Sequence, residues 1–187
     1  MHDHAPILDD RVHRHLAEKI RPAETTTVCH LNVEWAPVTD TVEGLNSRPG
    51  VVGQGEPISI SAGLALAYEP FRIGDTWGPP WGTTWFHLTA TVPPKHRDDH
   101  LEMIVDLGGV WDSPGFQSEG LVVRPDGSII KALNPRNTWI PVETDTEGHI
   151  DVYVEAASNP ILLAQPPFQP TAVSYTHLRA HETREDL

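Results

Sequence analysis

Apolar and polar residues alternate along much of this 187-residue chain, in short runs that end at glycine or proline. Alternation with a period of two predicts β-strands, and the short, turn-bounded spacing of the runs favours antiparallel neighbours. We expect strands over residues 25–35, 85–92, 101–107, 120–124, 128–133, 138–142 and 149–157. Pro125, Asp126 and Gly127 separate two of these runs and predict a hairpin. The pattern predicts a mainly β fold, an antiparallel β-sandwich or jelly roll.

One segment near the N-terminus has a helical pattern instead. Four apolar residues recur there at intervals of four, namely Leu8, Val12, Leu16 and Ile20. This spacing predicts a short helix over residues 9–21, which Pro22 ends. Because an amphipathic helix buries its apolar stripe, we expect it to pack on the outside of a sheet. Residues 58–67 fit either a strand or a helix.

Composition narrows the class of protein. A hydrophobic fraction of 39% and six tryptophans indicate one folded domain with a core. The formal charge of −13 argues against nucleic acid or an anionic membrane as a partner, since both bind basic surfaces. The single cysteine, Cys29, fits a reducing compartment, and neither a signal peptide nor a membrane-spanning run is visible. We therefore expect a soluble, cytoplasmic domain.

The stretch over residues 71–93 concentrates aromatic rings between glycines and prolines. Such a loop can close the end of a β-sandwich, or it can present a flat apolar platform to a sugar ring. Trp85 and Trp139 lie on expected strands and are expected in the core, whereas Trp77 and Trp81 lie in the loop. These two are expected to face solvent or a partner domain. Trp111 completes the aromatic set.

Titratable residues give little support for catalysis. Acidic residues on or beside expected strands are Glu102, Asp106, Glu119, Asp151 and Glu155. A pair of them could act as a glycosidase acid and nucleophile, but a solvated strand face explains them as well. His2 and His4 imitate a metal motif without an accompanying strand, and His13 and His15 lie on nearly opposite faces of the helix. We expect no catalytic residue and no metal ligand in this chain.

Several blocks of sequence resemble one family. In chain order they are GDTWGPPWGTTWFHLTATVP, VDLGG, PGFQSEGLVVRPDG, KALNPRNTWIPV and HIDVYVEAASNP. Together they resemble the N-terminal domain of the α-mannosidases of glycoside hydrolase family 38, over residues 5–172. The resemblance implies a β-sandwich of the galactose-binding-like type, placed ahead of a catalytic barrel that carries zinc and a nucleophilic aspartate. That barrel hydrolyses terminal α-mannosides with retention of configuration.

The barrel's zinc motif, His-x-His followed by Asp, is absent from this chain. The resemblance therefore implies a non-catalytic accessory domain, truncated before the barrel, with zinc expected only in the missing catalytic domain. The expected partner is that barrel, and the residues expected to contact it or a mannoside ligand are Trp77, Trp81, Arg136 and Asn137. The alternative is a stand-alone carbohydrate-binding module. A homo-oligomer formed through the parent enzyme is a third expectation.

The C-terminal residues form a separate segment. Residues 1–172 are expected to make up the β-sandwich domain, and the composition becomes polar from Val173 onward. The peptide SYTHLRAHET resembles translated adapter sequence at the ends of truncated reading frames. We predict that residues 173–187 are a non-native tail.

Overall fold

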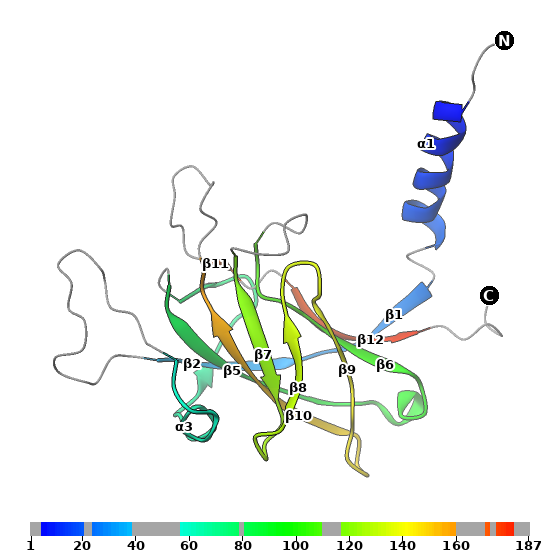
Figure 1. The fold of residues 1–187 in the computed structure, drawn as a ribbon. Coiled ribbons are helices and arrows are strands. Elements are labelled where there is room, and N and C mark those ends of the chain that lie inside the picture. Colours follow the sequence, from blue (N-terminus) through cyan, green and yellow to red (C-terminus); the bar gives the residue numbers. More distant parts are fainter. Residues whose placement is uncertain are drawn as a thin grey trace.

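Two antiparallel β-sheets form the body of the protein in the computed structural model (Figure 1). The structure describes residues 5–20, 24–38, 57–78, 81–109, 117–159, 171–172 and 175–181, the last two ranges by their backbone only. The four-stranded sheet has the order β1 (Thr25–His30), β12 (Tyr175–His181), β6 (Leu101–Asp106) and β9 (Trp139–Pro141). The six-stranded sheet has the order β3 (Glu69–Pro70), β2 (Asn32–Pro37), β5 (Thr83–Thr91), β10 (His149–Ala157), β7 (Glu119–Val123) and β8 (Ile129–Leu133).

The remaining elements are short. β4 (Thr76–Trp77) pairs with β11 (Thr171–Ala172) in a two-stranded sheet. The helical elements are α1 (Ala5–His15), the π-helix η1 (Leu16–Ile20), α3 (Ile60–Leu64) and the 3-10 helix η2 (Pro94–His96). Within the described residues the predicted strands over 85–92, 101–107, 120–124, 128–133, 138–142 and 149–157 are all present, and no end is displaced by more than two residues. The predicted mainly β class is confirmed.

The core lies between the two large sheets. The alternating pattern of β5 and β10 turns Phe86, Leu88 and Val154 inward, each at most 2% exposed. Met103 of β6 and Ile140 of β9, both almost fully buried, belong to the same cluster from the other sheet. Burial of this kind is the main favourable term in folding, so the strand pattern fixes which sheet faces meet.

The other face of the six-stranded sheet is partly covered by α3. Ser59 caps this helix, since its Oγ accepts a hydrogen bond from the Ala62 amide at 3.3 Å. A Cβ on Gly63 would lie 2.1 Å from the Trp85 ring, so only glycine allows the helix to approach the sheet this closely. Residues 58–67 are thus a short helix and turn, one of the two alternatives that the sequence allowed.

The predicted strand over residues 25–35 is wrong as a single element. The structure divides it at Leu31 into β1 and β2, which belong to different sheets. Leu31 is 6% exposed and lies in the core cluster. An extended run of β-branched residues does not reveal where a chain passes from one sheet to the other.

The predicted packing of the N-terminal helix is also wrong. α1 and η1 begin at Ala5, four residues before the expected start, and they project away from the sheets (Figure 1). None of their residues is buried. The apolar stripe of the helix therefore does not cover the outer face of either sheet.

No strand was predicted in the C-terminal segment, but the structure contains one. The backbone of β12 pairs with β1 on one side and with β6 on the other. Peptide groups form such ladders whatever the side chains, so a polar segment can complete a sheet. The domain boundary at residue 172 and the non-native origin of the tail stay predictions.

Candidate functional site

The aromatic loop lies at one end of the sandwich. The strand register places Thr83 beside Ala157, and Ala157 beside Glu119. Gly120 is in turn opposite Leu133. The loop before β5 and the turn after β8 therefore share one end of the six-stranded sheet, with β10 and β7 between them.

The prediction that Trp77 faces solvent or a partner domain is wrong. Trp77 is a core residue. It is 1% exposed, and its indole N–H donates to the Leu107 carbonyl at 3.0 Å. Its ring meets that of Phe86 edge to face, with centroids 5.4 Å apart. A ring buried on this scale has no face available for a sugar.

Trp81 is the exposed member of the loop, at 56%. Its φ of +67° is unusual for a bulky residue, because the left-handed region brings Cβ against the backbone. Ser158 holds this conformation: its carbonyl accepts from the Trp81 amide at 2.9 Å, and its Oγ accepts from the Gly82 amide at 3.1 Å. The loop thus holds the backbone of Trp81 in a strained conformation and leaves its indole exposed.

Arg136 and Asn137 lie in the tight turn that follows β8. Paired backbone hydrogen bonds between Asn134 and Asn137 close the turn, and the Arg136 amide donates to Asn134 Oδ1 at 2.9 Å. The Arg136 side chain is exposed. The structure places this turn and Trp81 at the same end of the sandwich.

The prediction that Trp139 lies in the core is wrong, whereas Trp85 is fully buried as expected. Ile140 of the same short strand points inward, so its neighbours point outward, and Trp139 is 42% exposed. Lys131 Nζ lies 3.0 Å from the centroid of the Trp139 ring, a cation–π contact. Trp111 lies outside the described residues.

A cluster that sequence reasoning missed crosses the outer face of the six-stranded sheet. His87 of β5 contacts Glu34 of β2 through Nδ1 at 3.1 Å and Asp151 of β10 through Nε2 at 3.0 Å. Tyr153 stacks on the imidazole with centroids 4.3 Å apart, and Tyr68 meets both rings at 5.6 Å. These polar residues occupy outward positions on neighbouring strands, so only the register could have revealed the cluster.

Burial perturbs the two tyrosines of this cluster. It raises the pKa of Tyr68, with a further contribution from Tyr153. It also raises the pKa of Tyr153, where the nearby carboxylates Asp151 and Glu34 add to the effect. Both phenols therefore stay neutral at physiological pH. The Tyr68 hydroxyl donates to the Gly63 carbonyl at 2.8 Å, and Tyr153 packs on the neighbouring rings.

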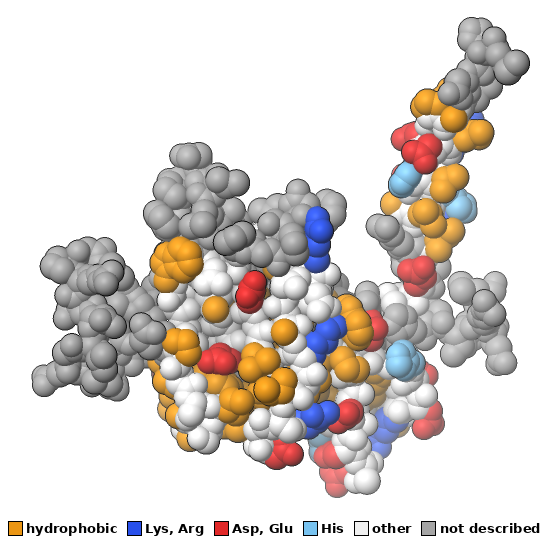
Figure 2. Space-filling view, viewed as in Figure 1, with side chains coloured by type: hydrophobic (Ala, Val, Ile, Leu, Met, Phe, Trp, Pro, Cys, Tyr) orange, Lys and Arg blue, Asp and Glu red, His pale blue; other side chains and the backbone are white. Residues whose placement is uncertain are grey.

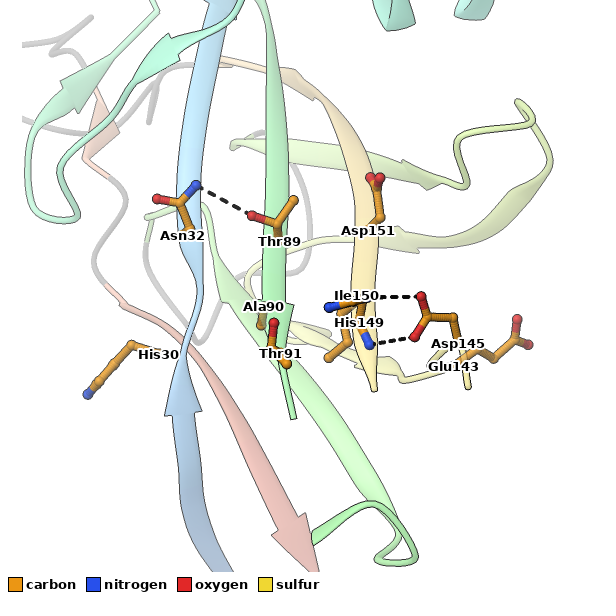
Figure 3. A pocket seen from close by; sticks show the side chains of 10 residues that line it. All are labelled: His30, Asn32, Thr89, Ala90, Thr91, Glu143, Asp145, His149, Ile150 and Asp151. Carbon is orange, nitrogen blue, oxygen red and sulfur yellow. Dashed lines mark hydrogen bonds and ion pairs between the residues drawn. The ribbon is translucent and has the colours of Figure 1, made fainter. Parts of the chain in front are cut away.

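An open polar cleft of about 760 Å³ lies where Thr91 of β5 pairs with His149 of β10, at the opposite end of these strands from Trp81. Figure 3 shows the side chains that line it. Asn32, Thr89 and Asp151 line it from neighbouring strands, and Asn32 donates to the Thr89 hydroxyl at 3.4 Å. Asp145 borders it from the turn before β10, and His149 borders it from the first position of β10. The cleft is rich in hydrogen-bonding groups, and its aliphatic lining is limited to Ala90 and Ile150.

A second groove, of about 320 Å³, lies on the outer face beside β7 and β10. It is lined by Glu119 and Glu155, two of the acidic residues noted in the sequence, and by Leu121, which lies opposite Glu155. Burial raises the pKa of Glu155. Within the described residues, no three His, Cys, Asp or Glu side chains are grouped so that they could hold a metal ion.

The sequence was compared with known protein families. Residues 47–180 match the family model described as alpha-mannosidase, jelly roll domain. The chain belongs to this family. The two-sheet sandwich described above is the architecture that the family name states, so the predicted fold and the predicted resemblance are both confirmed.

Two curated relatives support the assignment of this jelly-roll domain. Alpha-mannosidase 2C1 of Homo sapiens is 33% identical over 101 residues, which make up 51% of this chain. Alpha-mannosidase G of Dictyostelium discoideum is 29% identical over 108 residues, which make up 56% of this chain. The matched region represents 9% of the length of each relative. Among the described residues, no helix has the length and apolarity that a membrane span requires.

Proposed function

We propose that this jelly-roll domain is the non-catalytic accessory domain of a larger, cytoplasmic α-mannosidase, whose other part hydrolyses terminal α-mannosides. The observation that carries the proposal is the family match over residues 47–180, together with relatives that are named α-mannosidases and are far longer than the matched region. A catalytic barrel holding zinc would lie in the rest of such a protein.

The outer-face cluster supports a non-catalytic role. A retaining glycosidase needs two carboxyl groups about 5 Å apart, with the glycosidic bond between them. Glu34 and Asp151 instead contact opposite nitrogens of the His87 ring, at 3.1 and 3.0 Å. The imidazole occupies the space that a substrate would need, so this pair serves the structure of the sheet.

The end of the sandwich that carries Trp81 is the proposed contact with the catalytic barrel. Trp81, Arg136 and Asn137 are the residues of this contact. An exposed tryptophan is typical of an interface anchor, because its large, rigid ring has few side-chain torsions to order when it docks. Trp77 takes part only by supporting the loop from within the core.

The accessory role is tested by assaying the 187-residue chain for hydrolysis of an aryl α-mannoside, with and without added zinc. We expect no turnover above the buffer rate. Zinc-stimulated turnover that Glu155→Gln abolishes would contradict the proposal, because it would place an active site in the groove of Glu119 and Glu155.

The second candidate function is a stand-alone carbohydrate-binding module, which the exposed indole of Trp81 favours. Calorimetric titration with mannose oligosaccharides separates the two functions. Saturable binding that Trp81→Ala removes, while a Trp139→Ala control retains it, would favour the module. The accessory role predicts no measurable binding in any of the three proteins.

A further inference from the structure

The groove on the outer face of the six-stranded sheet combines apolar walls with two carboxylates. Its volume is about 320 Å³, and its apolar lining includes Leu121, Ala132 and Ala157. Glu119 and Glu155 are the charged residues that line it. Figure 2 shows acidic side chains set among hydrophobic ones in the part of the molecule where Figure 1 places β7 and β10. The groove thus offers apolar contact and negative charge together.

The strand register places the two carboxylates on one face of the sheet. Glu155 of β10 is opposite Leu121 of β7, and Ala157 is opposite Glu119. Opposite residues of an antiparallel pair share a face, and so do residues two apart on one strand. Glu119 and Glu155 are therefore diagonal neighbours, about 7–8 Å apart along the sheet. One cation with several donors can lie between two carboxylates at this spacing.

Glu155 is a half-buried carboxylate without a cation. Trp85, which is fully buried beneath α3, lies opposite it on β5. Burial raises the pKa of Glu155, and the described residues add no positive charge that offsets the effect. Within the part of the chain that the structure describes, Glu155 takes part in no hydrogen bond or ion pair. Because an unpaired charge is costly to bury, this side chain lacks a partner that the described fold does not supply.

Two other acidic residues on the same face are paired. Glu34 and Asp151 each lie against a ring nitrogen of His87, at 3.1 and 3.0 Å. Glu155 is only four residues beyond Asp151 on the same strand, yet it has no equivalent of His87 beside it. The sheet thus pairs the acids that connect its own strands and leaves the carboxylate in the groove available to an external cation.

We propose that this groove takes an arginine side chain from the catalytic part of the parent protein, an inference that rests on the proposed accessory role. The guanidinium lies between Glu119 and Glu155, where its charge complements both carboxylates. Its aliphatic stem packs on Leu121 and Ala157, as the stems of long basic side chains do on apolar surfaces. Arginine suits the groove better than lysine, because its planar fork presents donors to two carboxylates at once.

The groove is continuous with the end of the sandwich that carries Trp81. Thr83 and Ala157 line the groove and form the last pair of β5 and β10 at this end. Trp81 precedes Thr83 by two residues, and Ser158, which holds the backbone of Trp81, directly follows Ala157. A polypeptide docked against Trp81 therefore reaches the groove, so the two form one contact surface.

Butylguanidinium, which reproduces the end of an arginine side chain, tests the groove in the intact 187-residue chain. We expect it to shift the amide resonances of Leu121 and Ala157 saturably, with a dissociation constant of about 1–20 mM, as its few atoms allow. Butylurea has nearly the same shape without the charge, and it should bind at least about tenfold more weakly. No saturable shift with butylguanidinium up to about 100 mM, or equal binding of butylurea, would overturn the proposal.

Glu155→Gln and Glu147→Gln provide a matched comparison. Each removes one carboxylate and keeps the size of the side chain, but Glu147 lies in the exposed turn before β10. We expect Glu155→Gln to weaken butylguanidinium binding at least about fivefold and Glu147→Gln to leave it within about twofold. Equal loss of binding in both variants would overturn the position of the site.

The stability of Glu155→Gln separates a binding role from a structural one. Because the variant removes an unpaired, half-buried charge, its urea midpoint at pH 7 should equal or exceed that of the wild type. A midpoint clearly below that of the wild type would show that Glu155 serves the fold, and it would overturn the proposal.

Two further measurements on the same chain test the source of the arginine. Sedimentation velocity should show no dimer that depends on Glu155, whereas a dimer that Glu155→Gln dissociates would assign the groove to a second copy and overturn the proposal. Butylguanidinium binding by a chain without mannosidase turnover supports both the groove and the accessory role. No binding by such an inactive chain overturns the groove alone, and turnover by the chain overturns the accessory role and with it the catalytic part as the source.

Discussion

At the scale of single residues, Asp145 orders the turn that leads into β10. One carboxylate oxygen accepts from the backbone amides of Glu147 and His149, at 2.9 and 2.8 Å. The other lies 3.0 Å from His149 Nδ1. These hydrogen bonds, with the His149 amide foremost, lower the pKa of Asp145.

This lowered pKa makes one contribution to the pH dependence of the stability of the domain. The ionised form of Asp145 is favoured by folding, so its contribution is complete above the unfolded pKa of about 3.9 and is lost as the pH falls through the lower folded value. Asp145→Asn should therefore reduce the urea midpoint at pH 7, and the difference from wild type should shrink at pH 3. Glu147→Gln, in the same exposed turn, should leave the midpoint nearly unchanged. A difference that does not vary with pH would show that the charge of Asp145 does not order the turn.

At the scale of elements, the loop before β5 depends on Ser158, which follows β10. The Ser158 side chain is 2% exposed, accepts from the Gly82 amide at 3.1 Å and donates to the Gly82 carbonyl at 3.0 Å. These hydrogen bonds connect the residue before β5 to the residue after β10. They also hold the backbone conformation of Trp81.

We expect Ser158→Ala to lower the free energy of unfolding by about 1–3 kcal/mol, because it leaves a buried amide without its partner. The freed loop should also change the fluorescence of Trp81. Ser61→Ala, on the exposed side of α3, is the control and should cost less than about 0.5 kcal/mol. A Ser158 variant as stable as the control would mean that water replaces the lost hydrogen bonds.

At the scale of the whole molecule, Trp77 connects the two large sheets. Its ring packs on Phe86 of the six-stranded sheet, and its indole N–H reaches the Leu107 carbonyl at the end of β6 in the other sheet. Trp77 is therefore a structural residue of the sandwich, although it belongs to the loop that also exposes Trp81.

Trp77→Ala should destabilise the domain by about 3–5 kcal/mol, the usual cost of removing a large core side chain, as measured by chemical denaturation. Trp81→Ala should change stability by less than about 0.5 kcal/mol, because that ring is exposed. Similar costs for the two variants would contradict the opposite positions that the structure gives these rings.

Much of this protein could be predicted from the chain itself. Residue alternation located β5, β6 and β10, the Pro-Asp-Gly turn located the β7–β8 hairpin, and the sequence blocks identified the family before any coordinates were considered. These features depend on contacts close in sequence, such as strand pleating and turn chemistry, which a single sequence displays directly.

Only the tertiary structure decided which outward residues meet and which aromatic rings are buried. The Glu34–His87–Asp151 cluster requires three strands in one register, and those strands are far apart in the chain. The opposite positions of Trp77 and Trp81 depend on how the loop crosses the end of the sandwich, because alternation does not extend through glycines and prolines. The sequence by itself determined most of the strands and the family, whereas long-range packing determined the division of residues 25–35 between two sheets, the pairing of β12 and the surface that remains for a partner.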